Sequence, residues 1–385
     1  MSAAPELASP SVAAPARDVV IATFSGRALA ASARRAGYRP YVADLFADND
    51  LRDLVDGFET VHGDFVTGFD GGELMAALER LASRCTPLGV LCGPGFEDRP
   101  ELLEAIAARW PLLGNGAAVV RALKDPMRFA ALCAAAGIRH PETRLDPPPG
   151  DDGWLSKRVG AAGGLHIGLP SSRPHAADRY YQRFTAGARV SALFVASRGT
   201  AVTLAFSRQW LGPTEALPFR YGGACGPVHP GADAEAGMTR AVSAVAAALP
   251  NLVGLGSADF LLGAEGPVLL EINPRPGASL EVFDGVACPL FAIHLAACGG
   301  RLPPAAPHFP SAKALGYAYL DRDEVAIERD TWPDWVSDRP ARGTILHRDA
   351  PICTLTAEAP TPDEAIALFE ARLKIIKREV EGQDT

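Results

Sequence analysis

The stretch ADFLLGAEGPVLLEINPR, residues 258–275, holds two apolar runs separated by the short segment Gly-Ala-Glu-Gly at 263–266. Two β-type runs joined by a short glycine-containing segment are typical of a β-hairpin. If the strands pair around this turn, Asp259 lies opposite or next to Glu271. Glu271 and Asn273 then share a face, because side chains alternate along a strand.

Two carboxylates and an amide oxygen at the end of such a hairpin provide hard oxygen donors of the kind that suits Mg²⁺. The flanking runs LGSADFLL and VLLEI are apolar, so charges in this strand pair need a partner. A solvated edge of polar residues is the alternative, and the hairpin alone supports it equally well. Other features of the sequence are therefore needed to decide between a metal site and a solvated polar edge.

A glycine-rich segment, KRVGAAGGLHIG at 157–168, begins with Lys157. Glycines allow backbone N–H groups to approach phosphate closely, and a lysine adds a point charge. From the segment alone, a flexible hairpin is the favoured alternative. Lys124, further upstream, is by itself only a surface lysine.

Residues 18–113 alternate between β-type runs such as DVVIA and LGVLC and helical runs such as RALAASARRAG. This alternation predicts an open, doubly wound domain whose ligands bind beyond the carboxyl ends of the strands. Ser25–Arg27 and Gly93–Glu97 are expected on that side. The first turn reads TFSGR rather than G-x-G-x-x-G, so a dinucleotide oxidoreductase is poorly supported.

The composition narrows the class of protein. A length of 385 residues predicts about two to three domains. The net charge of −8 argues against a nucleic-acid scaffold, and no apolar run reaches the about 18 residues of a membrane helix. Seven cysteines without a C-x-x-C pair favour reduced thiols over zinc or a disulfide framework. We expect a cytoplasmic protein with a flexible tail at residues 1–17.

The order of these features resembles the ATP-grasp superfamily. It runs from Lys124 with its helix, through Lys157 with its glycine loop and the YYQRF strand at 180–184, to the Asp259 hairpin and the EINPR sequence at 271–275. Two further segments, EINPRPGASLEVFD and SRQWLG…FRYGGACGP, look like the carboxylate–amine ligase branch. That branch includes tyramine–glutamate ligases and ligases of one-carbon (methanopterin- and methanofuran-type) cofactor biosynthesis.

The resemblance implies an α/β (α+β) ATP-grasp fold covering nearly the whole chain. A Rossmann-like, doubly wound pre-ATP-grasp domain would span residues 18–113. The ATP-grasp domain would span 114–302, with a lid subdomain at about 150–185. A small β-rich segment with a terminal helix would occupy 303–385.

The resemblance also implies roles for individual residues. The nucleotide contacts would be Lys124, Lys157, Gly163, Gly164, Gln182, Arg183 and Phe184, the last three through their backbone along the adenine edge. The metal ligands would be Asp259, Glu271 and Asn273, holding one or two Mg²⁺ ions, with Mn²⁺ as an alternative. Arg275 and Lys157 would act on the transferred phosphoryl group. The substrate contacts would be Arg208, Tyr221 and Ser279, with the Arg208 guanidinium suited to a substrate carboxylate.

Two positions depart from the family's pattern. Arg158 stands where proline commonly follows the second lysine, and no carboxylate stands near Arg189 to take the ribose hydroxyls. Phosphate and metal binding are expected in spite of these departures.

The function that the resemblance implies is an ATP-dependent carboxylate–amine ligase. Such an enzyme activates a carboxylate as an acyl phosphate and releases ADP and phosphate, here with one-carbon cofactor biosynthesis as the expected pathway. Its partners would be small-molecule carboxylate and amine substrates rather than nucleic acid or membrane, and a homo-oligomer stays open. Two alternatives are a biotin-carboxylase-like enzyme that uses bicarbonate and a non-catalytic module that senses ATP.

Overall fold

The hairpin at residues 258–273 forms as the sequence predicts. In the computed structural model, which describes residues 17–382, strand β13 (Gly254–Gly263) pairs antiparallel with β14 (Gly266–Asn273). Asp259 lies directly opposite Glu271, and the register shifts immediately afterwards, between Asp259 and Phe260. The predicted pairing of the two carboxylates is therefore confirmed.

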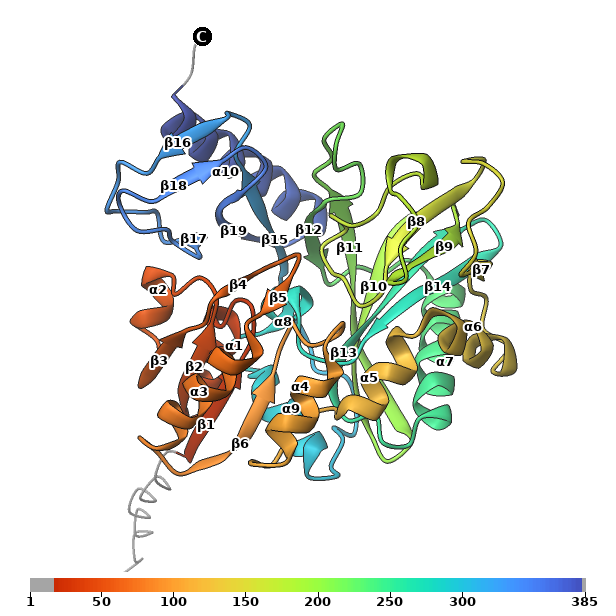
Figure 1. The fold of residues 1–385 in the computed structure, drawn as a ribbon, viewed down its shortest axis with the longest axis horizontal. Helices are drawn as coiled ribbons and strands as arrows, with labels where there is room; N and C mark the ends of the chain where they lie inside the picture. The colour runs from red at the N-terminus through yellow and green to blue at the C-terminus, as the bar shows by residue number, and fades with distance from the viewer. Residues whose placement is uncertain (1–16, 383–385) are drawn as a thin grey trace, which may run out of the picture.

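This hairpin forms one edge of an eight-stranded antiparallel sheet in the order β14-β13-β10-β11-β12-β15-β19-β17 (Figure 1). The other six strands are β10 (Ala188–Ser197), β11 (Thr200–Leu211), β12 (Tyr221–Gly226), β15 (Ala312–Tyr319), β17 (Val336–Ser337) and β19 (Pro351–Ala359). Three of these come from the expected C-terminal segment, so residue 303 marks no break in the sheet. That segment adds the pair β16 (Glu324–Ala326) and β18 (Ile345–His347) and helix α10 (Pro362–Glu381), which begins at a Thr361–Glu364 capping box.

Helices cover both faces of the central sheet because β10 is apolar on both sides. Val190, Ala192 and Phe194 pack in one core with α5 (Ala117–Lys124), α6 (Pro126–Ala135) and α7 (Ala232–Ala248). Leu193 and Val195 point the other way, into a second core with α8 (Ala278–Phe283) and α9 (Leu290–Cys298). The hairpin therefore stands between two buried layers.

The N-terminal region is the predicted doubly wound unit. Its parallel sheet has the order β3-β2-β1-β6, made from β1 (Arg17–Ala22), β2 (Tyr38–Asp44), β3 (Gly57–Thr60) and β6 (Pro87–Cys92). Helix α1 (Arg27–Arg35) packs with Val19 and Ile21 on one face, and α3 (Gly71–Ala82) with Val20 and Ala22 on the other. The remaining elements are α2 (Asn49–Arg52), the hairpin of β4 (Gly63–Asp64) and β5 (Gly68–Phe69), and α4 (Pro100–Ala107).

The expected lid is a separate three-stranded sheet in the order β7-β9-β8, made from β7 (Thr143–Arg144), β8 (Trp154–Arg158) and β9 (Arg179–Arg183). No regular strand forms between β8 and β9. A single bridge joins Ser156 to Gly168, and a short 3₁₀ turn (η1, Pro170–Ser172) follows. Left-handed glycines before this point and Pro170, which lacks an N–H, prevent a continuous ladder.

Two expectations concern the ends of the chain and membranes. The expected tail at residues 1–17 lies, except for Arg17, outside the described residues. Within residues 17–382, no helix combines the length and apolar character that crossing a membrane requires.

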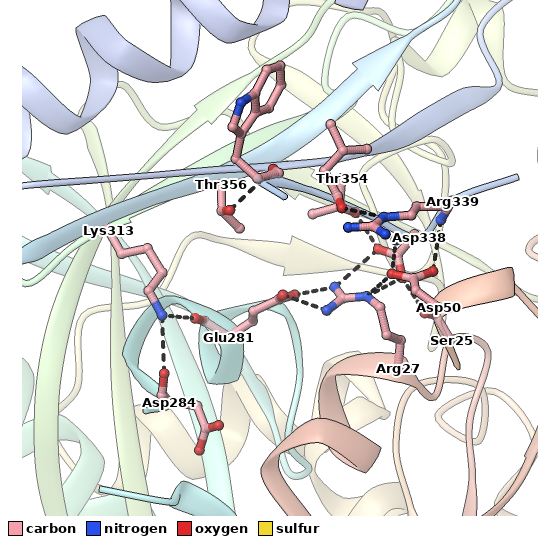
Figure 2. A network of polar contacts seen from close by, with 12 residues as sticks. Ser25, Arg27, Asp50, Glu281, Asp284, Lys313, Asp338, Arg339, Thr354 and Thr356 are labelled. Carbon is pink, nitrogen blue, oxygen red and sulfur yellow. Dashed lines mark hydrogen bonds and ion pairs between the residues drawn. The ribbon is translucent and has the colours of Figure 1, made fainter. Parts of the chain in front are cut away.

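A buried arginine joins three regions that are distant in sequence. The Arg27 guanidinium, at the start of α1, donates to both oxygens of Glu281 on α8 at 2.7 and 2.6 Å and to Asp338 at 2.8 Å. Asp50 lies 3.6 Å from it and accepts the backbone N–H groups of Asp338 and Arg339. Figure 2 shows how the N-terminal unit, α8 and the C-terminal strands converge on this one cation.

We predict that Arg27→Met lowers the free energy of unfolding by about 3–5 kcal/mol, because it leaves three clustered carboxylates without their buried cation. Chemical denaturation followed by circular dichroism measures the change. Arg34→Met is the matched control, since Arg34 on the same helix pairs with Asp56 at 2.7 Å with its side chain 40% exposed. That change costs about 0–1 kcal/mol. Equal effects of the two substitutions would contradict the prediction.

Candidate functional site

The predicted metal ligands come together at the end of the hairpin. Asn273 Nδ2 donates to Asp259 Oδ2 at 3.1 Å and lies 3.5 Å from Glu271 Oε1. The other oxygen of Asp259 accepts hydrogen bonds from Ser191 Oγ at 2.6 Å and from Gln209 Nε2 at 3.2 Å. The neighbouring strands β10 and β11 thus hold Asp259 in place. Ser191 is a site residue that no sequence motif indicated, whereas Gln209 lies in the SRQWLG segment that the resemblance singled out without giving Gln209 a role.

Lys124 is a buried site residue rather than a surface lysine. Its Nζ lies 2.7 Å from Asn273 Oδ1 and 3.3 Å from Glu271 Oε2. Burial would raise the pKa of Glu271, but the charges of Lys124 and Lys157 hold it below its ordinary value. For Asp259, burial and the charge of Glu271 both raise the pKa. The two lysines therefore favour the charged form of Glu271, whereas the pKa of Asp259 stays above its ordinary value.

The donor groups of the cluster fit a divalent cation. Two carboxylates and an amide oxygen are the hard donors that Mg²⁺ takes, and Mg²⁺ usually keeps water and substrate phosphates as its other ligands. Across the described residues, no three His, Cys, Asp or Glu side chains gather closely enough to hold a metal ion by themselves. A metal here would therefore rely on Asp259 and Glu271. Asn273 turns its Nδ2 to these carboxylates and its Oδ1 to Lys124, so its amide would have to turn over to supply an oxygen ligand.

Lys157 lies at the lid side of the same site. Its Nζ donates to Gln182 Oε1 at 2.6 Å, and burial lowers its pKa to about 8. A buried ammonium whose hydrogen-bond partner is a neutral amide attracts an anionic ligand, because burial of charge is costly without compensation. This buried positive charge makes the Lys157–Gln182 pair suited to binding the phosphate end of a nucleotide.

The glycine loop lies folded over residues 219–221. Gly163 and Gly164 have left-handed φ angles of +72° and +75°, and a Cβ on Gly164 would overlap the carbonyl oxygen of Phe219. The N–H of Tyr221 donates to the carbonyl of Gly163 at 3.0 Å. Within the loop, His166 Nδ1 is buried and has no hydrogen-bond partner among the described residues. Such an orphaned ring nitrogen fits a loop that lies over a polar ligand.

Two backbone N–H groups of the expected adenine edge are already bonded within the protein. The backbone N–H groups of Arg183 and Phe184 donate to the carbonyls of Glu142 and Gly153, both at 2.8 Å, because β9 is the middle strand of the lid sheet. These two donors are therefore already used, and both side chains are exposed. Gln182 enters the site through its side chain instead of its backbone.

Arg275 leaves the end of β14 and meets the N-terminal unit. Its Nε donates to Glu97 Oε1 at 2.6 Å, and the two side chains are only 14% and 5% exposed. A Cβ on Gly277 would overlap Arg275 Nη1, so a larger residue there would displace the guanidinium. Asn115 holds the preceding residue by donating to the carbonyl of Pro274 at 2.8 Å. The sequence placed Glu97 on the ligand side of the sheet without identifying its partner.

The three expected substrate contacts are not all at the site. Arg208 is a correction: it lies on the opposite face of β11 from Gln209, beside Cys225, and pairs with Asp363 at 3.0 Å. Burial and the nearby Tyr317 and Asp259 raise the pKa of Tyr221 well above its ordinary value, which agrees with a position near the cluster. Ser279 is buried in the first turn of α8, four residues after Arg275.

Comparison with known proteins agrees with this arrangement. A family model for the ATP-grasp domain matches residues 128–279. No curated protein matches the chain. The biotin carboxylase domain of 2-oxoglutarate carboxylase from Hydrogenobacter thermophilus, solved with MgADP and bicarbonate, is similar at a TM-score of 0.70 and 12% identity. The similarity covers 93% of this chain and 89% of that one.

Two further solved structures are similar over nearly their whole length. The L-amino acid ligase of Bacillus licheniformis has a TM-score of 0.67 at 13% identity, covering 94% of this chain and 98% of that one. The N5-carboxyaminoimidazole ribonucleotide synthetase of Thermotoga maritima has a TM-score of 0.65 at 13% identity, covering 93% and 98%. Identities this low show the fold alone. The chain therefore has an ATP-grasp fold, as the order of its motifs predicts.

We predict that Gly164→Ala weakens nucleotide binding at least about tenfold, because the new methyl group pushes the loop away from Phe219 (about 1.4 kcal/mol). Gly163→Ala is the matched control, since its φ is also left-handed but its nearest atom would lie 4.0 Å away. Calorimetric titration with MgADP measures both dissociation constants. Similar losses in both variants would show that backbone strain, rather than the contact with Phe219, sets the affinity.

Proposed function

We propose that this chain is an ATP-dependent ligase that joins a carboxylate to an amine through an acyl phosphate. The observation that carries the proposal is the grouping of Lys124, Lys157 and Arg275 around the Asp259–Glu271–Asn273 cluster. Lys124 contacts Glu271 and Asn273 directly, and Arg275 follows Asn273 by two residues and pairs with Glu97. This set of charges suits phosphoryl transfer, which needs mainly positioning and neutralisation.

Each residue has a distinct part in the proposed reaction. Asp259, Glu271 and Asn273 would hold Mg²⁺, which neutralises phosphate charge when bound. Lys124 and Lys157 would neutralise the phosphates of ATP.

In the proposed reaction, a carboxylate oxygen of the substrate bonds to the γ-phosphorus as the bond to the ADP oxygen breaks, and Arg275 stabilises the charge on the group in transfer. The amine then bonds to the acyl carbon as phosphate leaves, and the amine nitrogen loses a proton. The acyl phosphate is reactive towards water, so the glycine loop must remain closed over it until the amine attacks. The contacts of that loop with residues 219–221 fit this requirement.

The similarity to biotin carboxylase domains favours one alternative, an enzyme that activates bicarbonate. That enzyme would also form ADP and phosphate, so the carbon source separates the two. A non-catalytic ATP sensor would give no turnover with any substrate. The same proposal includes membership of the tyramine–glutamate ligase branch and a role in one-carbon cofactor biosynthesis. It also includes a cytoplasmic location and assembly as a homo-oligomer.

We predict that turnover releases ADP and phosphate in equal amounts, and that neither AMP nor pyrophosphate forms. The measurement is a screen of carboxylate–amine pairs for phosphate release, with bicarbonate as a separate arm and mass spectrometry of each product. An amide product supports the ligase, and a carboxylated product supports the alternative. AMP as the stoichiometric product would rule out the acyl phosphate.

We predict that Glu271→Gln lowers kcat about 10²–10³-fold without loss of fold, because it removes one charge from the metal ligands at nearly constant volume. Glu265→Gln is the control, since Glu265 lies in the turn of the same hairpin with its side chain 84% exposed and paired to Arg139. Steady-state rates at limiting and saturating Mg²⁺ measure the effect. Near-normal turnover of Glu271→Gln at limiting Mg²⁺ would remove Glu271 from the metal site.

A further inference from the structure

We propose that Glu97 and Asp98 are positioning residues that couple closure of the lid to the orientation of Arg275. The two residues are adjacent in the loop that follows β6, and this inference rests on the proposed function. Glu97 contacts the end of the hairpin, and Asp98 contacts the lid. The loop thus touches both parts of the site that must act together.

The Glu97 side of the loop is rigid. One oxygen of its carboxylate accepts from Arg275 Nε at 2.6 Å, and the other accepts the N–H groups of Gly95 and Phe96 at 2.9 and 3.1 Å. The carboxylate is therefore fixed to its own loop, and Arg275 is fixed to the carboxylate. A movement of this loop must move the Arg275 guanidinium or break a buried ion pair.

The Asp98 side reaches the lid. Asp98 Oδ2 accepts from Arg158 Nη2 at 3.0 Å, and both side chains are mostly buried. Arg158 is the last residue of β8 and directly follows Lys157, at the start of the glycine loop. Arg158 is also one of the two positions that depart from the pattern the family resemblance implied.

A close contact between backbones strengthens this link. Gly160 has a φ of +71°, and a Cβ there would lie 2.6 to 2.7 Å from the backbone N and Cα of Asp98 and from the carbonyl carbon of Glu97. No side chain fits between the two loops. The first turn of the lid loop therefore rests directly on the 97–98 peptide.

The loop has further supports in the segment after β1 and in the β4–β5 hairpin, so the lid contact is one of several that set its position. The N–H of Phe24 donates to the carbonyl of Pro94 at 2.9 Å, and the Arg99 guanidinium donates to the carbonyls of Thr67 and Phe69. When the lid opens, Asp98 loses Arg158 and the Gly160 contact together. Arg275 then loses part of the support for its partner Glu97. Phosphoryl transfer would proceed at full rate only while the lid is closed.

Hydrogen exchange tests the lid contact without turnover. In the full chain with Mg²⁺ and a non-hydrolysable ATP analogue, we expect Asp98→Asn to raise exchange in residues 159–168 about tenfold (1.4 kcal/mol). Asp178→Asn is the matched control, because Asp178 is the second carboxylate near Arg158, at 3.9 Å and 58% exposed. It should leave exchange unchanged. Unchanged exchange in Asp98→Asn would overturn the lid contact, whatever reaction the protein catalyses.

Rates test the coupling. We expect Asp98→Asn to lower kcat about tenfold with the KM for ATP changed less than about threefold, and to raise the share of ATP hydrolysed without product. Glu97→Gln should have the same signature. In the double variant the two effects should be less than additive, because both act through Arg275. Additive effects on kcat would show that Glu97 and Asp98 act independently and would overturn the inference.

The two tests separate the two proposals. If no carboxylate–amine pair gives turnover, the proposed function fails while the exchange experiment still decides the lid contact. In that case the rate of ATP hydrolysis without a second substrate is measured in the same variants to test the coupling between the lid and Arg275. Retention of more than half of kcat by Arg158→Lys, with loss in Arg158→Gln, would support the ion pair with Asp98, and equal loss in both would count against it.

Discussion

Two carboxylates placed side by side in an apolar strand pair are the constraint on which this site depends. Asp259 and Glu271 face each other across the hairpin, and burial of both charges is unfavourable unless cations and donors surround them. Lys124 reaches them from the end of α5, and the Ser191 and Gln209 side chains donate to Asp259. The two carboxylates are hard oxygen donors, which makes the cluster suited to a divalent metal. The other residues of the site surround this pair of carboxylates.

Charged contacts between distant segments hold the frame around this cluster. Arg27 binds Glu281 and Asp338, and Glu97 binds Arg275 from the loop after β6. Such buried ion pairs contribute little net stability, because desolvation offsets the attraction, but they penalise any other arrangement strongly. Their value here is geometric. They set where the N-terminal unit lies relative to the hairpin, and so where Arg275 points.

Strand parity explains the correction of Arg208, and the middle position of β9 explains why two N–H groups of the expected adenine edge are already used. Arg208 differs from Gln209 by one position on β11, and that step moves its guanidinium to the opposite face, beside α10. The N–H groups of Arg183 and Phe184 are used by neighbouring backbone because β9 lies in the middle of its sheet. Both facts depend on which strands are neighbours. A motif read along one strand does not contain that information.

The sequence by itself determined the local features: the hairpin around Gly263–Gly266, the pairing of Asp259 with Glu271, the glycine loop after Lys157 and the doubly wound N-terminal unit. These follow from periodicity, turn chemistry and spacing within short segments. Only the tertiary structure decided that Lys124 is buried, that Glu97 meets Arg275, that Asp98 meets Arg158 and that the C-terminal strands extend the central sheet. Each of these contacts joins residues far apart in the chain. Their formation depends on how whole layers of helices and sheets pack. The sequence pattern within a short segment does not determine that packing.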